Sequence, residues 1–203
     1  MSLGVILSSH VPTATPPKGK KHKSIDYFIE GGVPLYSKLG QRGASGCPIG
    51  PDRLLTAAHV WENTKGNGDL AAIVKVLEGV KPVLLNAMWI DVKKDIGILR
   101  VKEDENFQFT KWFIMKKRIP IPGERLKMLL NNPTAQDGII FGNLAWIESD
   151  GALMLDMAGF PGVSGSCILD EEENVVAIVS GVWAVSDIAM RPFIKAVSVR
   201  EVK

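Results

Sequence analysis

The chain has 203 residues, of which 46% are apolar and 23% charged, and its formal net charge is +2. This composition fits one large or two small globular domains, which need neither disulfides nor a metal to fold. The balanced charge gives no overall field that would indicate nucleic acid or a membrane as the main partner. No apolar run reaches the length of a membrane span or of a signal-peptide core. We therefore expect a soluble, cytoplasmic protein, in a bacterial or a host cell, with no signal peptide or transmembrane segment.

The first segment in chain order is basic. Residues 16–23, PPKGKKHK, combine two prolines with four lysines and a histidine. Such a block cannot bury apolar surface, so residues 1–26 are predicted to form a flexible basic arm. We expect a solvated leader or linker, and the alternative is a weak contact with nucleic acid, an acidic partner or an anionic membrane.

Short apolar and β-branched runs follow the arm, separated by Gly, Pro, Asn and Asp, and this pattern is typical of an all-β protein. Residues 27–103 contain six such runs: 27–36, 43–49, 53–57, 70–77, 82–90 and 96–102. Residues 104–122 lose this regularity and end in two prolines, which predicts a connector. Residues 123–203 contain six more runs: 125–130, 138–148, 152–157, 166–169, 175–183 and 193–199. Two groups of six strands suggest two small antiparallel barrels, although periodicity alone does not distinguish barrels from a sandwich.

Two strands of the first group adjoin residues suited to acid–base chemistry. The segment LLTAAHVW places small residues before His59, which would let this histidine lie at the packed end of a strand with its ring facing a cleft. The segment KKDIGILRV opens a buried strand with Asp95, a position from which a carboxylate can orient an imidazole. Asp91, four positions earlier, remains open as a rival acid.

The segment GFPGVSGSCIL in the second group has the composition of a nucleophile turn. Gly162 and Gly165 flank Val163 and Ser164. A nucleophilic serine needs a tight turn that points backbone N–H groups at one place, and glycines permit the required backbone angles. We expect Ser164 as nucleophile and the N–H groups of Gly162 and Ser164 as oxyanion-hole donors. An ordinary glycine-rich turn is the alternative.

The segments TAAH, DIGIL and GVSGS, in the order His, Asp, Ser, resemble the three signature segments of the trypsin/chymotrypsin-like serine peptidases. The resemblance covers residues 27–199. It implies two six-stranded antiparallel β-barrels with the active site in the cleft between them, His59 and Asp95 on the first and Ser164 on the second. It also implies a polypeptide substrate and no metal or other cofactor.

Several positions depart from the secreted digestive members of this family. Val163 stands where those enzymes carry the acid used in zymogen activation, and Val60 stands where they carry a cysteine. The resemblance is therefore closer to the viral and bacterial branches. Cys47 and Cys167 would lie near the barrel interface, where we expect two buried thiols in a reducing compartment, with a disulfide as the alternative.

The resemblance also implies where a substrate lies. The segment NVVAIVSGVW is similar to the strand that binds the substrate backbone, so the expected contacts are Ser180, Gly181 and Val182; the opposite wall, residues 156–161, adds Ala158 and Pro161. Ala158 falls near the position of the pocket-floor acid of trypsins, which argues against a pocket for Lys or Arg. Asp156 could supply a charge from a neighbouring position.

The function we predict is a monomeric serine endopeptidase that works through a Ser-His-Asp triad and an acyl-enzyme intermediate, with a viral or polyprotein-processing protease as one form of it. The alternative is a non-catalytic double barrel that binds a partner through its cleft or basic arm, and an esterase using the same residues is a third possibility.

Overall fold

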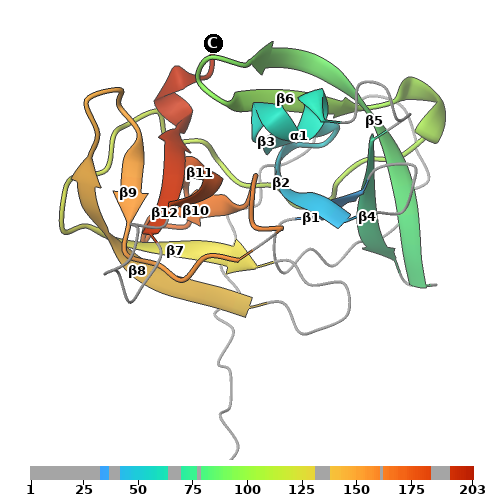
Figure 1. Ribbon diagram of the computed structural model, residues 1–203. Helices are drawn as coiled ribbons and strands as arrows, with labels where there is room; N and C mark the ends of the chain where they lie inside the picture. Colours follow the sequence, from blue (N-terminus) through green and yellow to red (C-terminus); the bar gives the residue numbers. More distant parts are fainter. Residues whose placement is uncertain are drawn as a thin grey trace, which may run out of the picture.

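Twelve strands form two closed, six-stranded antiparallel barrels that lie side by side (Figure 1). The computed structural model describes residues 33–36, 42–63, 70–76, 79–130, 138–160, 162–183 and 193–203. The predicted arm lies outside these residues. Among the residues described, no helix is long and apolar enough to span a membrane.

The first barrel has the strand order β1-β2-β3-β6-β5-β4 and the second the order β10-β11-β12-β9-β8-β7. The strands of the first barrel are β1 (Val33–Tyr36), β2 (Arg42–Gly50), β3 (Arg53–Thr56), β4 (Leu70–Val76), β5 (Gly79–Asp91) and β6 (Ile96–Val101). Those of the second are β7 (Arg125–Leu130), β8 (Gly138–Ile147), β9 (Leu153–Leu155), β10 (Cys167–Leu169), β11 (Val175–Trp183) and β12 (Phe193–Ser198). Three short helices complete the described elements: α1 (Ala58–Glu62), η1 (Glu103–Glu105) and η2 (Val199–Glu201).

All twelve predicted strands are present, and the predicted double-barrel fold is confirmed. One local prediction is wrong, because His59 does not end a strand. Strand β3 stops at Thr56, and His59 is the second residue of α1. Ala57 and Ala58 are small enough to let the chain turn into a helix while both remain fully buried.

The two barrels share buried contacts. Phe107, Phe109 and Phe113 of the connector join the core of the first barrel, as do residues of β10 and β11 such as Leu169 and Ile178. The amide of Phe109 also donates to the carbonyl of residue 51, in the turn between β2 and β3, and that of Phe113 to the carbonyl of residue 48 on β2. The connector is therefore fastened along its length, which fixes the two barrels relative to each other.

A buried carboxylate fastens the same connector to the second barrel. Asp170, only 4% exposed, follows β10 and accepts hydrogen bonds from the amides of Glu172 (3.1 Å) and Asn174 (2.9 Å) and from Arg118 (3.2 Å). Lys116 lies 3.6 Å away. Burial alone would raise the pKa of Asp170, but the hydrogen bonds and the two cations hold it below its ordinary value.

We expect Asp170→Asn to lower the free energy of unfolding by about 2 kcal/mol, because it removes the charge from several hydrogen bonds. Since the folded state lowers the pKa of Asp170, its stabilisation is present above the unfolded pKa and is lost as the pH falls below about 4. Urea denaturation at pH 7 and pH 3 measures both effects. Glu171→Gln, the same change at an exposed neighbour, is the control. Equal stability of the two variants at pH 7 would contradict the stabilising role of the Asp170 carboxylate.

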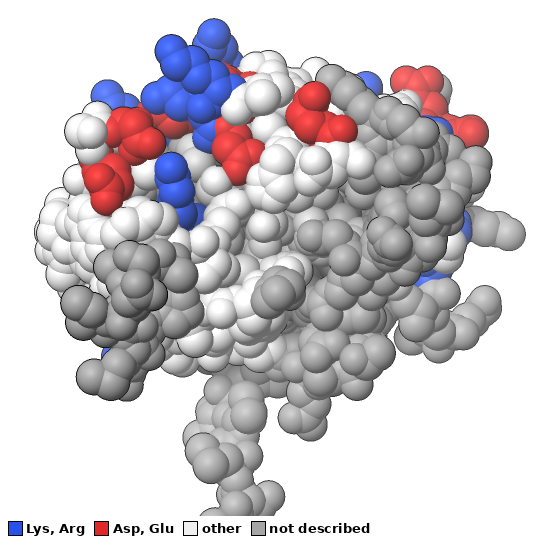
Figure 2. Space-filling model, viewed as in Figure 1, with Lys and Arg blue, Asp and Glu red and all other residues white. Residues whose placement is uncertain are grey.

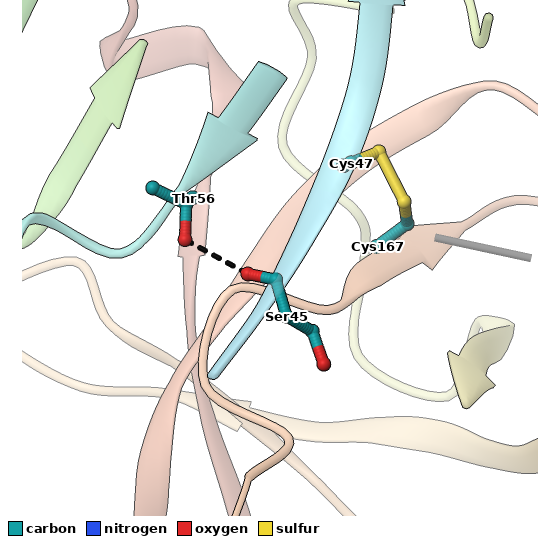
Figure 3. The surroundings of a disulfide bond; sticks show 4 residues. All are labelled: Ser45, Cys47, Thr56 and Cys167. Atoms are coloured by element: carbon teal, nitrogen blue, oxygen red, sulfur yellow. Dashed lines mark hydrogen bonds between the residues drawn. A yellow bond between two sulfur atoms is a disulfide. The ribbon is translucent and has the colours of Figure 1, made fainter. Parts of the chain in front are cut away.

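A disulfide between Cys47 and Cys167 also links the barrels (Figure 3). The expectation of two buried thiols is therefore wrong. Strands β2 and β10 bring the two Cα atoms to 5.4 Å, within the range that a disulfide spans. Because disulfides are rare in reducing compartments, the pairing does not support the expected cytoplasmic location, which remains a prediction.

The disulfide closes a long loop, since the two cysteines are 120 residues apart. We expect dithiothreitol to lower the free energy of unfolding of the wild type by about 4 kcal/mol, because reduction frees the unfolded chain. Urea denaturation with and without the reductant measures the effect. The double variant Cys47→Ala/Cys167→Ala should be insensitive to dithiothreitol. A wild type that is equally insensitive while reduced would contradict the prediction.

Candidate active site

His59 and Asp95 meet at the edge of the first barrel. Asp95 lies in the turn between β5 and β6 with φ of 55°, a left-handed conformation that Asp adopts more readily than most residues. Its carboxylate oxygens are both 3.0 Å from His59 Nδ1, and its Oδ1 also accepts the His59 amide at 2.9 Å. An imidazole that donates from Nδ1 to a carboxylate has its Nε2 free to accept a proton.

The second barrel adds a third donor to this carboxylate. Ser180 Oγ on β11 donates to Asp95 Oδ2 at 2.5 Å. Burial alone would raise the pKa of Asp95, but hydrogen bonds from the His59 ring, from Ser180 and from the His59 amide hold it below its ordinary value. Asp95 is therefore ionised at neutral pH and suited to stabilise an imidazolium.

Asp91, the rival acid, has a different environment. Its Oδ1 accepts the amide of Lys94 at 3.0 Å and so closes the turn between β5 and β6. The structure thus brings Asp95, and not Asp91, to His59.

Ser164 lies in a turn that leaves selected backbone amides free. The amides of Val163, Gly165 and Ser166 donate to the carbonyls of residues 160, 179 and 163. Within the described part of the chain, the amides of Gly162 and Ser164 and the hydroxyl of Ser164 donate no hydrogen bond. No hydrogen bond joins Ser164 to His59 among these residues, and such bonds often form only when substrate is bound.

The side chain of Val163 holds the turn by packing where the secreted members carry an acid. It is 3% exposed and packs into the apolar core of the second barrel. An apolar anchor at this position needs no new amino terminus as an ionic partner. Val163 therefore anchors the turn to the second barrel by apolar packing.

Ser45 of β2 holds the turn from the first barrel. Its amide donates to the carbonyl of Ser164 at 2.7 Å, and its hydroxyl donates to the carbonyl of Gly162 at 2.9 Å. Its own carbonyl accepts from Thr56 Oγ1 at 2.9 Å (Figure 3). Both turn carbonyls are thus bound to β2, which leaves the amides of Gly162 and Ser164 available.

Gly165 lies close to Ser45 and Thr56. A Cβ on Gly165 would lie 2.0 Å from the carbonyl oxygen of Ser45 and 2.3 Å from Thr56 Oγ1, and its φ is +84°. Only glycine combines this conformation with this approach. The serine turn and β2 therefore form one unit across the barrel interface.

We expect Ser45→Ala to lower kcat for peptide cleavage by about 10- to 100-fold, because the Gly162 carbonyl loses its anchor and the neighbouring amides lose their alignment. KM should change by less than about 3-fold, because Ser45 is buried and cannot contact a peptide. Steady-state kinetics separates the two constants. Ser166→Ala is the control, because its hydroxyl is as buried and has no partner among the described residues. Equal kcat values for both variants would exclude this role for Ser45.

The predicted substrate-binding residues lie beside this turn, with one outside the described residues. A Cβ on Gly181 would meet nothing within 4 Å, so space is open beside β11, and Val182 is 43% exposed. Ala158 is exposed on the opposite segment. Ser180 uses its hydroxyl to bind Asp95, so only its backbone is free for a substrate. Pro161 lies outside the described residues.

Sequence analysis missed the contacts that Ser45, Thr56 and Ser180 make with the site. Ser180 directly follows the apolar run VVAIV within the same strand, and a polar residue there was a detectable sign. Nothing in the sequence around Ser45 or Thr56 indicated their partners.

Two antiparallel barrels that meet at a histidine–aspartate pair and a glycine-flanked serine define a class, the trypsin-type serine endopeptidases. Residues 44–178 match the family model described as trypsin-like peptidase domain, and the chain belongs to this family. The resemblance drawn from the sequence is confirmed, and the chain is by class a serine endopeptidase, a hydrolase. No curated protein matches the sequence significantly.

Solved structures of bacterial proteases share the fold. The MamO protease domain of Magnetospirillum magneticum superposes with a TM-score of 0.63 at 14% identity, covering 83% of this chain and 91% of its own. The Rv3671c protease of M. tuberculosis, in its inactive form, gives 0.63 at 19% identity, covering 85% of each chain. A serine endoprotease from Yersinia pestis gives 0.60 at 17% identity, covering 81% of this chain and 57% of its own.

Proposed function

We propose that the chain cleaves peptide bonds through Ser164 as nucleophile, His59 as general base and Asp95 as the residue that orients the base. The observation that carries this proposal is the carboxylate of Asp95, whose two oxygens accept from His59 Nδ1 while Ser180 fixes it from the other barrel. A carboxylate held on three sides sets both the orientation and the tautomer of the imidazole.

The reaction follows from these positions. His59 Nε2 takes the proton of Ser164 Oγ as this oxygen attacks the carbonyl carbon of the peptide bond. The resulting oxyanion lies at the amides of Gly162 and Ser164, and each donor contributes on the order of 100-fold or more to the rate. When the tetrahedral intermediate collapses, the C–N bond breaks and His59 gives its proton to the leaving amine. Water then attacks the acyl carbon with His59 as base, the bond from this carbon to Ser164 Oγ breaks, and His59 returns the proton to Ser164 as the acid product leaves.

Covalent labelling tests this proposal. A fluorophosphonate should add one phosphonyl group to the folded protein, and peptide mapping by mass spectrometry should locate it on Ser164. A library of peptides incubated with the same sample should yield new amino termini. A folded protein that neither takes the label nor cleaves any peptide would instead support the alternative function, a non-catalytic double barrel that binds a partner.

We also propose that the peptidase is a viral or polyprotein-processing enzyme. Only Val163 supports this proposal: its side chain packs in the core, as expected of a peptidase that needs no activating cleavage. The contact of residues 16–23 with nucleic acid or an acidic partner falls on residues outside those described. A monomeric state and the division into residues 1–26, 27–103, 104–122 and 123–203 also stay predictions.

A further inference from the structure

The disulfide between Cys47 and Cys167 lies beside the serine turn (Figure 3). Cys47 stands two residues after Ser45 on β2, and Cys167 stands three residues after Ser164 at the start of β10. Both cysteines are fully buried, and both belong to the core of the first barrel. The disulfide therefore joins the segment that carries the nucleophile to the strand that holds this segment in place.

The hydrogen bonds of Ser45 cross the barrel interface at the same place. Its amide donates to the Ser164 carbonyl at 2.7 Å, and its hydroxyl donates to the Gly162 carbonyl at 2.9 Å. If β2 and the serine turn moved apart by about 1 Å, both hydrogen bonds would be lost, because a donor and an acceptor about 3.6 Å apart no longer form one. The alignment of the turn therefore depends on a small and fixed separation of these two segments.

Reduction of the disulfide changes the space that its two sulfur atoms need. Thiol sulfurs are not bonded to each other, so they move to the contact distance of non-bonded heavy atoms, which for carbon is about 3.5 to 4.0 Å. Protein interiors are packed as densely as organic crystals, and a fully buried pair has little empty space to enter. We therefore expect β2 to move away from the start of β10, which lengthens the hydrogen bonds of Ser45.

We propose that Cys47 and Cys167 are a redox-controlled positioning pair of the peptidase. In the disulfide form, Ser45 holds the serine turn with the amides of Gly162 and Ser164 aligned for the oxyanion. In the dithiol form, β2 withdraws from the turn and the two amides lose this alignment. The inference rests on the proposed peptidase function and names a regulator of the same site, a reductant of the dithiol class.

The reduction is a thiol–disulfide exchange in two steps. A thiolate of the reductant attacks one sulfur, the S–S bond breaks, and a mixed disulfide forms. The second thiol of the reductant then displaces the remaining protein sulfur. The protein gains two electrons and two protons, and the reductant becomes a cyclic disulfide.

The surroundings of the disulfide do not favour this attack in the folded protein. Figure 2 shows charged side chains mainly along the upper margin of the molecule, while the described surface over the middle of the second barrel is mostly uncharged. The described part of this face therefore has no cluster of cations there to attract an anionic thiolate. Since both cysteines are also fully buried, reduction of the folded protein should be slow.

Peptide kinetics of the oxidised and the reduced wild type tests the positioning pair. The protein is reduced with dithiothreitol in urea and refolded by dilution with the reductant present. The mass gained with iodoacetamide counts the free thiols, and tryptophan fluorescence shows whether the sample is folded. We expect reduction to lower kcat by about 10- to 100-fold, because a displacement of about 1 Å in an active site costs up to about 100-fold. KM should change by less than about 3-fold, because neither cysteine can contact a peptide.

Two controls separate this effect from a loss of stability. Reoxidation of the reduced wild type with oxidised glutathione should restore the starting kcat. The double variant Cys47→Ala/Cys167→Ala should have the same kcat with and without dithiothreitol. If the reduced chain does not refold, kcat is followed during slow reduction of the folded protein, and it should fall as free thiols appear while the native fluorescence persists.

Fluorophosphonate labelling of the oxidised sample distinguishes the two ways of failing. An oxidised, folded wild type without label or cleavage would overturn the proposed function and the positioning pair together. An oxidised wild type that is labelled on Ser164, and that keeps its kcat within about 3-fold when reduced and folded, would overturn the positioning pair alone. So would a double variant that dithiothreitol slows as much as the wild type, or a kcat that falls only in step with the native fluorescence.

Discussion

Replacing Ser164 by alanine should lower kcat for peptide cleavage by about 10⁶-fold, because no oxygen remains to form the acyl-enzyme. The amides of Gly162 and Ser164 survive the change, so part of the oxyanion stabilisation persists and some rate above that in water remains. The Ser164 hydroxyl donates no hydrogen bond among the described residues, so the free energy of unfolding should change by less than about 0.5 kcal/mol. Steady-state kinetics at saturating peptide, intact mass after fluorophosphonate treatment and urea denaturation measure the three quantities.

Ser166→Ala is the matched control, which tests whether the loss of activity is specific to the nucleophile. The substitution is identical and lies two residues away, and Ser166 is buried with a hydroxyl that has no partner among the described residues. Its rate of peptide cleavage should stay within about 3-fold of the wild-type rate. It should also take up the full phosphonyl label. Cleavage by Ser164→Ala above about 1% of the wild-type rate would show that another group is the nucleophile.

The strands could be predicted from the sequence because the residue pattern of a barrel strand is local. In β8, exposed and partly buried residues alternate from Gly138 to Phe141, and a glycine or a polar turn bounds most of the other strands. The motifs around His59 and Ser164 are equally local, since each needs small residues within two positions. Both the fold class and the candidate catalytic residues could therefore be read from short windows of sequence.

Contacts between residues that lie far apart in the sequence have no such local pattern. Ser45 lies 117 positions from Gly162, and Ser180 lies 85 from Asp95, yet both bonds form across the barrel interface. The alternation of a strand tells which residues face inward but not which strand of the other barrel lies opposite. For the same reason the pairing of Cys47 with Cys167 could not be predicted.

Asp95→Asn should lower kcat by about 10⁴-fold while the fold is retained. An asparagine has one carbonyl oxygen in place of two carboxylate oxygens, so it cannot accept from His59 Nδ1 and Ser180 in the present way. It no longer holds the tautomer that leaves Nε2 as the base, and it cannot neutralise the imidazolium. Because the pKa of Asp95 lies below its ordinary value, the wild-type carboxylate is charged at neutral pH, so steady-state kinetics at pH 7 and pH 8 compares the variant with an ionised carboxylate.

Asp91→Asn is the matched control for this loss, and it also decides between the two acids. Asp91 accepts only the amide of Lys94 among the contacts described, and an asparagine oxygen can accept the same hydrogen bond. Its kcat should stay within about 3-fold of the wild type at the same pH values. If Asp91→Asn instead lost activity by orders of magnitude while Asp95→Asn kept it, Asp91 would be the acid that orients His59. The geometry around the Asp95 carboxylate would then describe a state other than the active one.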